Sequence, residues 1–432
     1  MDCLVQELED MNIFQDEMPC WAKWIGFVCR LWVPERPVGL DRPCEEKDFR
    51  DYRSTVNRDL QNIRTRLLIL IQNRDSEKIN IDADEESVRN FVICLLVLIG
   101  EHSEKNVWNN AESVSLAQDL TSELCKFCRS PNLSIVLTMS DDKFLATLMA
   151  LRPKLLKDTW KKFPAAVACY KWLLQQVGGL YLSPRALQIL PTALIIFDDF
   201  VPENRIIGLE CIRLILHDSE TRQELMKNGY IDVIYDALEC LSHQRDVRYI
   251  LPLYASLSNV LATIDSCANS MDNFEWTKRD TIIMGLLSNM ESEQNLELRC
   301  SYMLSLPQLV TNVGCAKWFD YLTRILSEYC DRHNDLRTLK ATLQAAQTIL
   351  PMFPLSVLRR CDTLYTAFLK LRCDLTETPV FDREINQLLD KCTHIIYKVA
   401  PNIGATIMYD DRVRSITDYS FNFACFDDKY CN

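Results

Sequence analysis

Apolar residues recur at helical spacing along most of the chain, most clearly between residues 183 and 218. Two stripes with spacings of three and four residues follow one another there: Leu187, Leu190, Leu194 and Phe197, then Ile207, Cys211 and Leu214. Such spacing places each set on one side of an α-helix. Because the second stripe starts soon after the first, the segment is predicted to form two antiparallel helices joined by a very short turn.

The boundaries of this predicted hairpin carry their own signals. Ser183 is a good N-cap and Pro184 suits the first helical position, while Pro202 starts the second helix with Glu203 in its first turn. Gly208 lies in mid-helix, where glycine costs about 1 kcal/mol relative to alanine. That position makes sense if another backbone comes close to it.

Helical patterns also cover most of the remaining sequence. Before the hairpin they span 53–73, 85–101, 111–129, 141–156 and 164–177; after it they span 220–227, 231–241 and 247–264, then the pairs 276–290 with 296–313, 316–329 with 336–350, and 355–371 with 381–399. Pairs of helices repeating at roughly 40 residues are typical of HEAT and armadillo solenoids. Only 10 of 432 residues are glycine, against about 7% in an average protein. The sequence therefore predicts an all-α chain, a HEAT/armadillo-like solenoid of antiparallel helix pairs with more than about 60% helix.

The periodicity predicts four parts. These are an aromatic-rich helix with a Pro-broken loop at 1–50, N-terminal helical repeats at 51–180, HEAT-like repeats at 181–400 and a polar tail at 401–432. The aromatic-rich helix, which includes Trp21 and Trp24, is expected to cap the N-terminal end of the core. Docking of a partner protein by this helix is the alternative.

Charge and composition narrow the class of protein. A formal charge of −12 argues against nucleic-acid binding, which requires a basic face. The acidic N-terminus lacks the pattern of a signal peptide, so the 19 cysteines are expected to be reduced thiols in the cytosol. The longest apolar run, residues 91–99, is far shorter than the ~20 residues that span a bilayer, and is expected to be a buried helix face. Neither a membrane nor a nucleic acid is therefore an expected partner.

Motifs for catalysis or metal binding are scarce. Cys125 and Cys128 form a CxxC, but no second CxxC or His pair stands at zinc-finger distance, and the five histidines are scattered singly. No Walker loop, GxSxG, HExxH or GxGxxG occurs. We expect no catalytic residue, no bound metal and no cofactor, and we predict that the protein is not an enzyme.

Residues 164 to 211 resemble a known family. The matching elements are Pro164–Val167, Lys171–Val177, Ile189–Pro191, Asp198–Asp199, Glu203–Arg205 and Gly208–Cys211. In this order they resemble the family of the second Tel-two-interacting protein, the smallest subunit of the Triple-T (TTT) complex. The flanking sequence agrees with the family only in being helical and of similar total length.

The resemblance implies a scaffold without an active site, bound to the two larger helical-repeat TTT subunits. That complex is a co-chaperone that works with the heat-shock-ninety machinery in the maturation and stability of phosphatidylinositol-3-kinase-related kinases (PIKKs). The expected location is the cytoplasm and nucleus. A HEAT-repeat adaptor of nuclear transport or phosphatase type is the alternative function, and partner purification would distinguish the two.

The turn between the hairpin helices is the candidate partner-binding site. It comprises Asp198, Asp199, Glu203, Asn204 and Arg205, and it is charged at a position where solenoid loops emerge. The alternative is structural: one aspartate orders the turn and the other meets a basic group of a neighbouring repeat. Catalysis by the two aspartates is disfavoured because adjacent residues on a helix do not face one another.

Overall fold

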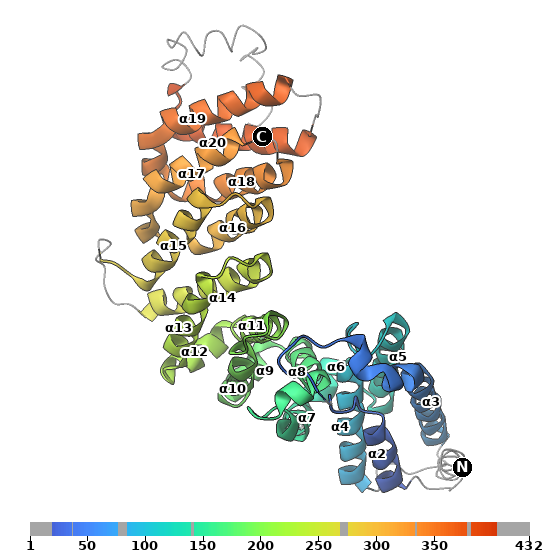
Figure 1. The fold of residues 1–432 in the computed structure, drawn as a ribbon. Helices are drawn as coiled ribbons and strands as arrows, with labels where there is room; N and C mark the ends of the chain where they lie inside the picture. The colour runs from blue at the N-terminus through green and yellow to red at the C-terminus, as the bar shows by residue number, and fades with distance from the viewer. Residues whose placement is uncertain are drawn as a thin grey trace. The chain divides into compact units, whose positions relative to one another are not determined.

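A computed structural model describes residues 20–36, 38–76, 84–139, 142–267, 275–332, 335–377 and 382–403. Among these residues 81% are helical and none is in a strand, so the predicted all-α solenoid is confirmed. The chain divides into two compact units, residues 1–228 and 229–432 (Figure 1). The four sequence-based ranges, 1–50, 51–180, 181–400 and 401–432, stay a prediction, and the tail beyond residue 403 lies outside the described residues.

The first unit is built around one helix that is buried on all sides. Its α-helices are α2 (Trp21–Arg30), α3 (Arg50–Asp75), α4 (Glu85–Glu101), α5 (Ala111–Phe127), α6 (Leu133–Thr138), α7 (Lys143–Leu151), α8 (Pro164–Gln176), α9 (Gly179–Leu182), α10 (Ala186–Phe197), α11 (Pro202–Ile215) and α12 (Ser219–Lys227). Every residue of α4 from Phe91 to Glu101 is buried, because α2, α5, α7 and α8 all pack against it. The apolar run at 91–99 is thus a core helix, as predicted.

The aromatic-rich N-terminal helix α2 caps this core. The rings of Trp21 and Trp24 lie 5.4 and 5.6 Å from the ring of Phe91 on α4. The indole Nε1–H of Trp32 donates to the carbonyl oxygen of Cys94 at 3.1 Å. Because its aromatic side chains are buried within the unit, the structure agrees with the capping interpretation and not with a helix that presents its aromatic face to a partner.

The predicted hairpin is present as α10 and α11, with two corrections. Ser183 does not cap α10; it starts the 3-10 turn η5 (Ser183–Arg185), which follows the short helix α9, and its side chain makes no capping bond. The buried face of α10 comprises Ala186, Ile189, Leu190, Ala193, Ile196 and Phe197, so Leu187 of the predicted stripe is exposed. The expected close approach at Gly208 is confirmed: a Cβ added there would lie 2.3 Å from the backbone nitrogen of Phe197.

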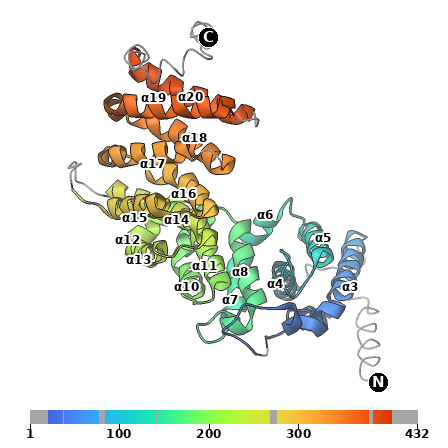
Figure 2. The same ribbon diagram turned by 45° about the horizontal axis from the view of Figure 1, so that its top comes forward.

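The second unit is a regular stack of helix pairs in two layers. Helices α13 (Tyr230–Ser242), α15 (Lys278–Ser292), α17 (Phe319–Asp331) and α19 (Pro354–Glu377) form one layer, and α14 (Val247–Cys267), α16 (Leu296–Leu309), α18 (Leu336–Ile349) and α20 (Arg383–Val399) form the other (Figures 1 and 2). Within each pair the helices pack on one another, and each helix also packs on the next of its own layer. The three predicted pairs after residue 276 are therefore confirmed.

Other details differ from the periodicity. The short helix α6 was not predicted, since it has too few residues to show a period. Helix α19 contains a non-helical residue at Arg360.

Two segments, Gly179–Phe197 and Val247–Cys267, are long and apolar enough to cross a membrane by composition, and 39% and 50% of the residues in their most apolar windows are buried. Core helices of soluble proteins pass the same test, so composition alone does not distinguish the two settings.

Candidate functional site

The five residues of the predicted site fall into two groups by exposure. Asp198 follows the last residue of α10 and is exposed, and Glu203 is exposed in the first turn of α11. Asp199 is buried, while Asn204 and Arg205 are partly buried. Among the three acids of the turn, Asp198 and Glu203 are therefore the ones that a partner protein can reach.

Asp199 has a structural role. Its carboxylate accepts a hydrogen bond from Nδ2 of Asn204 at 2.6 Å and forms an ion pair with Nζ of Lys161 at 2.7 Å. Its backbone carbonyl accepts from Nε of Arg205 at 2.8 Å. Asp199 thus orders the turn and also joins it to the segment before α8, so one residue performs both tasks of the structural alternative.

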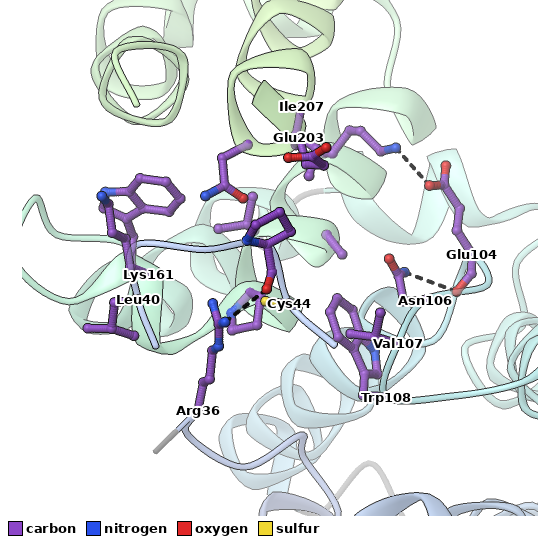
Figure 3. Close-up of a pocket in the computed structure, with 17 residues that line it drawn as sticks. Arg36, Leu40, Cys44, Glu104, Asn106, Val107, Trp108, Lys161, Glu203 and Ile207 are labelled. Atoms are coloured by element: carbon purple, nitrogen blue, oxygen red, sulfur yellow. Dashed lines mark hydrogen bonds and ion pairs between the residues drawn. The ribbon is translucent and has the colours of Figure 1, made fainter. Parts of the chain in front are cut away.

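A cavity of about 250 Å³, here called the groove, lies beside this turn (Figure 3). Four segments of the first unit line it: Arg36, Leu40, Pro43 and Cys44 before η1 (Glu46–Phe49); Glu104, Asn106, Val107 and Trp108 after α4; Trp160, Lys161, Pro164, Val167, Ala168 and Lys171 in η4 (Trp160–Lys162) and α8; and Glu203, Asn204 and Ile207 in α11. Two residues of the predicted site, Glu203 and Asn204, are therefore part of a larger concave surface.

The Pro-broken loop forms one wall of the groove and is held by the guanidinium group of Arg36. This buried side chain donates to the carbonyl oxygens of Arg42 and Pro43 at 3.1 and 3.0 Å, and its Nε lies 3.2 Å from the carboxylate of Asp48. Hydrogen bonds from Arg42 hold the pKa of Asp48 low, at about 2. The backbone N–H of Arg36 also donates to the carbonyl of Lys162 at 2.8 Å, which fixes the loop against η4.

The opposite wall combines a buried indole with an ion-pair network. The Nε1–H of Trp108 donates to the backbone carbonyl of Glu101 at 2.8 Å. Lys171 pairs with Glu104 at 2.7 Å and with Glu210 at 3.5 Å. Burial of Lys171 acts to lower its pKa, but these two carboxylates outweigh that effect and raise the pKa, so the lysine stays charged. This side of the groove therefore has a charged rim, formed by Lys171 and its two carboxylate partners.

The floor of the groove is apolar and continuous with the core. Trp108 packs in a cluster with Val33, Phe49 and Ala165, and Val107 and Ala168 pack against that cluster. Burial raises the pKa of Cys44, so this lining thiol is not activated as a nucleophile. An apolar floor inside a charged rim fits a protein segment whose side chains insert between charged groups.

Metal-binding geometry is not found in the described part of the chain. No group of three or more His, Cys, Asp or Glu residues there is arranged to hold a metal ion. Cys125 lies near the end of α5 and Cys128 follows it as the C-cap residue, both partly buried. Burial raises the pKa of the Cys125 thiol, which disfavours the thiolate that zinc requires.

Sequence reasoning identified one edge of the groove and missed the rest. The charged turn was found because Asp, Glu and Arg cluster between two apolar stripes. The walls come from loops at 36–44 and 104–108, which have no periodicity. Their one sequence signal is the Pro-rich, charged character of the first loop.

Comparisons with known proteins agree on the family and on the fold. No established family profile matches the chain. TELO2-interacting protein 2 of Rattus norvegicus is 27% identical over 298 residues, and the proteins of the same name in Mus musculus and Homo sapiens are 26% and 25% identical over 299 and 289 residues. These matches cover 64–65% of this chain but 56% of each relative, so the chain spans little more than half the length of the curated proteins it matches.

Among solved structures, a karyopherin-type HEAT solenoid from the complex of Kap95p with RanGDP has a TM-score of 0.54 with this chain. The superposition covers 92% of this chain and 44% of the other, at 14% sequence identity. A likeness at that identity shows the fold alone. The helix pairs establish a HEAT-like fold. The three sequence matches, at 25–27% identity, support membership of the chain in the TELO2-interacting protein 2 family.

Proposed function

We propose that this chain is a non-catalytic scaffold subunit of a TTT-type co-chaperone complex. The observation that carries the proposal is the sequence match to three proteins named for their interaction with TELO2. In this role the chain binds the two larger helical-repeat subunits. The assembled complex supports maturation and stability of PIKKs with the heat-shock-ninety machinery, in the cytoplasm and nucleus.

The groove supports a docking role in the first unit. Its floor offers buried aromatic and aliphatic surface, and interface hot spots concentrate in such pockets. Glu203 stands exposed at its edge, and Asp198 is exposed in the adjoining turn. Charges at such an edge steer and orient an approaching partner more than they hold it. We therefore propose that a basic or mixed-charge surface of a large subunit approaches this edge.

A charge-reversal pair tests the docking surface. Asp198→Lys with Glu203→Lys places like charges against a basic partner surface, and the expected loss of co-purified large subunit is at least tenfold. Asp199 is left unchanged, because a lysine at this buried position would disrupt the fold whether or not a partner binds.

The matched control is Asp75→Lys with Glu112→Lys. Asp75 is exposed at the end of α3, as Asp198 is at the end of α10, and Glu112 is exposed in the first turn of α5, as Glu203 is in α11. Both pairs change the net charge equally. If the folded charge-reversal variant co-purifies as much of the large subunit as the folded control variant does, this edge of the groove is not part of the interface.

Nuclear import is not favoured as a second function. The likeness to the chain from the Kap95p complex is one of fold at 14% identity and carries no information on partners. A transport or phosphatase adaptor would be supported if import factors or phosphatase subunits were recovered with the chain in place of TELO2-type proteins.

A further inference from the structure

Two cysteine thiols from separate helices meet inside the first unit. Sγ of Cys29 on α2 lies 3.4 Å from Sγ of Cys94 on α4, although the residues are 65 positions apart. A disulfide has an S–S length of about 2.05 Å, so the two sulfurs need to close by roughly 1.4 Å, a distance that side-chain rotation can supply. Both cysteines are free thiols in the structure.

The packing of α2 on α4 holds this pair together. Trp24, five residues before Cys29, has its ring edge-on to Phe91, and Trp32 bonds to the backbone carbonyl of Cys94 itself. These contacts lie on both sides of Cys29 along the chain, one within α2 and one just after its end. The short S–S separation therefore results from ordered helix packing and not from a flexible segment.

The two thiols differ in access and in acidity. Cys29 is partly exposed, whereas Cys94 is buried. The pKa of Cys29 is lowered, chiefly by its hydrogen bond with Cys94 and further by the charge of Lys154, although burial opposes this. The hydrogen bond and burial raise the pKa of Cys94. Cys29 thus has the character of an attacking thiol and Cys94 that of a resolving thiol.

We propose that Cys29 and Cys94 form a reversible redox site whose disulfide fastens the N-terminal helix to the core. The oxidant is a low-molecular-weight disulfide such as glutathione disulfide. The Cys29 thiolate attacks one of its sulfurs, forms a mixed disulfide and releases one glutathione thiolate, which takes up a proton.

Cys94 completes the reaction. Its sulfur attacks the Cys29 sulfur and forms the protein disulfide, while the proton of Cys94 passes to the departing second glutathione sulfur, which leaves as a thiol. Two protein thiols are oxidised and one glutathione disulfide is reduced to two thiols. This inference is independent of the proposed partner role, since it uses only contacts within the first unit.

The disulfide has a structural consequence for the groove. It closes a loop that contains the entire Pro-broken wall, because residues 36–44 lie between the two cysteines. Cross-linking a loop of this length restricts the unfolded chain, and the expected rise in melting temperature is about 10 °C. Reduction by dithiothreitol returns the lower melting temperature.

The test incubates the purified full chain in glutathione buffers of increasing oxidation and then blocks the remaining thiols with an alkylating agent. Peptide mass spectrometry is expected to recover the Cys29 and Cys94 peptides joined, with the mass lower by two hydrogens. Cys29→Ser and Cys94→Ala should abolish both this species and the rise in melting temperature. Cys240→Ser and Cys267→Ser, at exposed thiols of the second unit, should leave both unchanged.

Two results would overturn the proposal. One is alkylation of both Cys29 and Cys94 throughout the redox range. The other is a stable glutathione adduct on Cys29 with Cys94 still alkylated, which would mean that the buried thiol does not resolve the mixed disulfide. The Cys29→Ser variant, at the more exposed position, keeps the test valid if Cys94→Ala fails to fold.

Discussion

Replacing Gly208 by alanine tests how closely the hairpin helices approach. An added Cβ would lie 2.3 Å from the backbone nitrogen of Phe197 and 2.5 Å from its Cα. Ordinary contacts of a Cβ begin at about 3.4 Å, so the helices must separate by roughly 1 Å. Because the obstructing atoms are backbone atoms of α10, no side-chain rotation relieves the overlap.

Two opposing effects set the magnitude. Alanine is favoured over glycine in a helix interior by about 1 kcal/mol. Overpacking a well-packed core costs about 1–3 kcal/mol, and more when the backbone must move. Since the overlap here is with the backbone, we expect the repulsion to exceed the gain, with a net loss of about 2 kcal/mol and a fall in melting temperature of about 4–8 °C for a unit of this size.

Tryptophan fluorescence during thermal unfolding is a suitable assay, since six of the eight Trp residues lie in the first unit. Gly26→Ala is the matched control: Gly26 lies inside α2 of the same unit, and an added Cβ there meets nothing within 4 Å. It should gain about 1 kcal/mol. If Gly208→Ala is as stable as Gly26→Ala, the helices are not in backbone contact and the packing of the hairpin is wrong.

Two further predictions concern the buried carboxyl groups of Asp199 and Glu101, and a third concerns the metal content of the protein. Asp199→Ala should destabilise the first unit by about 2–3 kcal/mol, because Asn204 and Lys161 lose their shared partner. The control Asp198→Ala, at an exposed position, should change stability by less than about 0.5 kcal/mol. Equal losses of stability in denaturant titrations of the two variants would refute the structural role of Asp199. Burial raises the pKa of Glu101 to about 7 although Lys154 opposes it, so the folded state retains a proton that the unfolded state loses near pH 4.5. Stability should therefore fall by about 3 kcal/mol as the pH rises from 4.5 to 7, and Glu101→Gln should flatten that profile; parallel profiles would contradict the assignment. Purified protein should contain no stoichiometric zinc by elemental analysis, and one metal per chain lost on mutating Cys125 would contradict this expectation.

The sequence was most informative where one face of a helix is buried against another helix. Helix α4 begins and ends where the pattern predicted, because the acidic first turn and the apolar run mark it clearly. The repeat pairs of the second unit also follow from periodicity. Gly208 was informative for a different reason, since glycine in mid-helix is unfavourable unless the space for a side chain is absent.

Periodicity failed where several helix faces were equally apolar. Residues 186–197 are nearly all apolar, so Leu187 and Ile189 fit a buried stripe about equally well, and only the packing of α11 and α12 on this helix decides between them. Ser183 carried a valid capping signal, but α9 and η5 directly before α10 leave no free helix end to cap.

The groove could not be predicted because it is formed by tertiary contacts between loops. Arg36 and Glu203 are far apart in sequence and line the same cavity. The turn also showed two aspartates side by side without indicating which one is buried. That difference depends on Lys161, whose position is set by the loop before α8 and not by any local pattern.

Affinity purification of the tagged chain from its native cell, with quantitative mass spectrometry, tests the central claim most directly. A scaffold of a TTT-type complex should recover two large helical-repeat proteins, one of them of the TELO2 type, in near-equal amounts with the chain, and PIKKs or heat-shock-ninety components in smaller amounts. Recovery of import factors or phosphatase subunits in equal amounts, with no TELO2-type protein, would contradict the account.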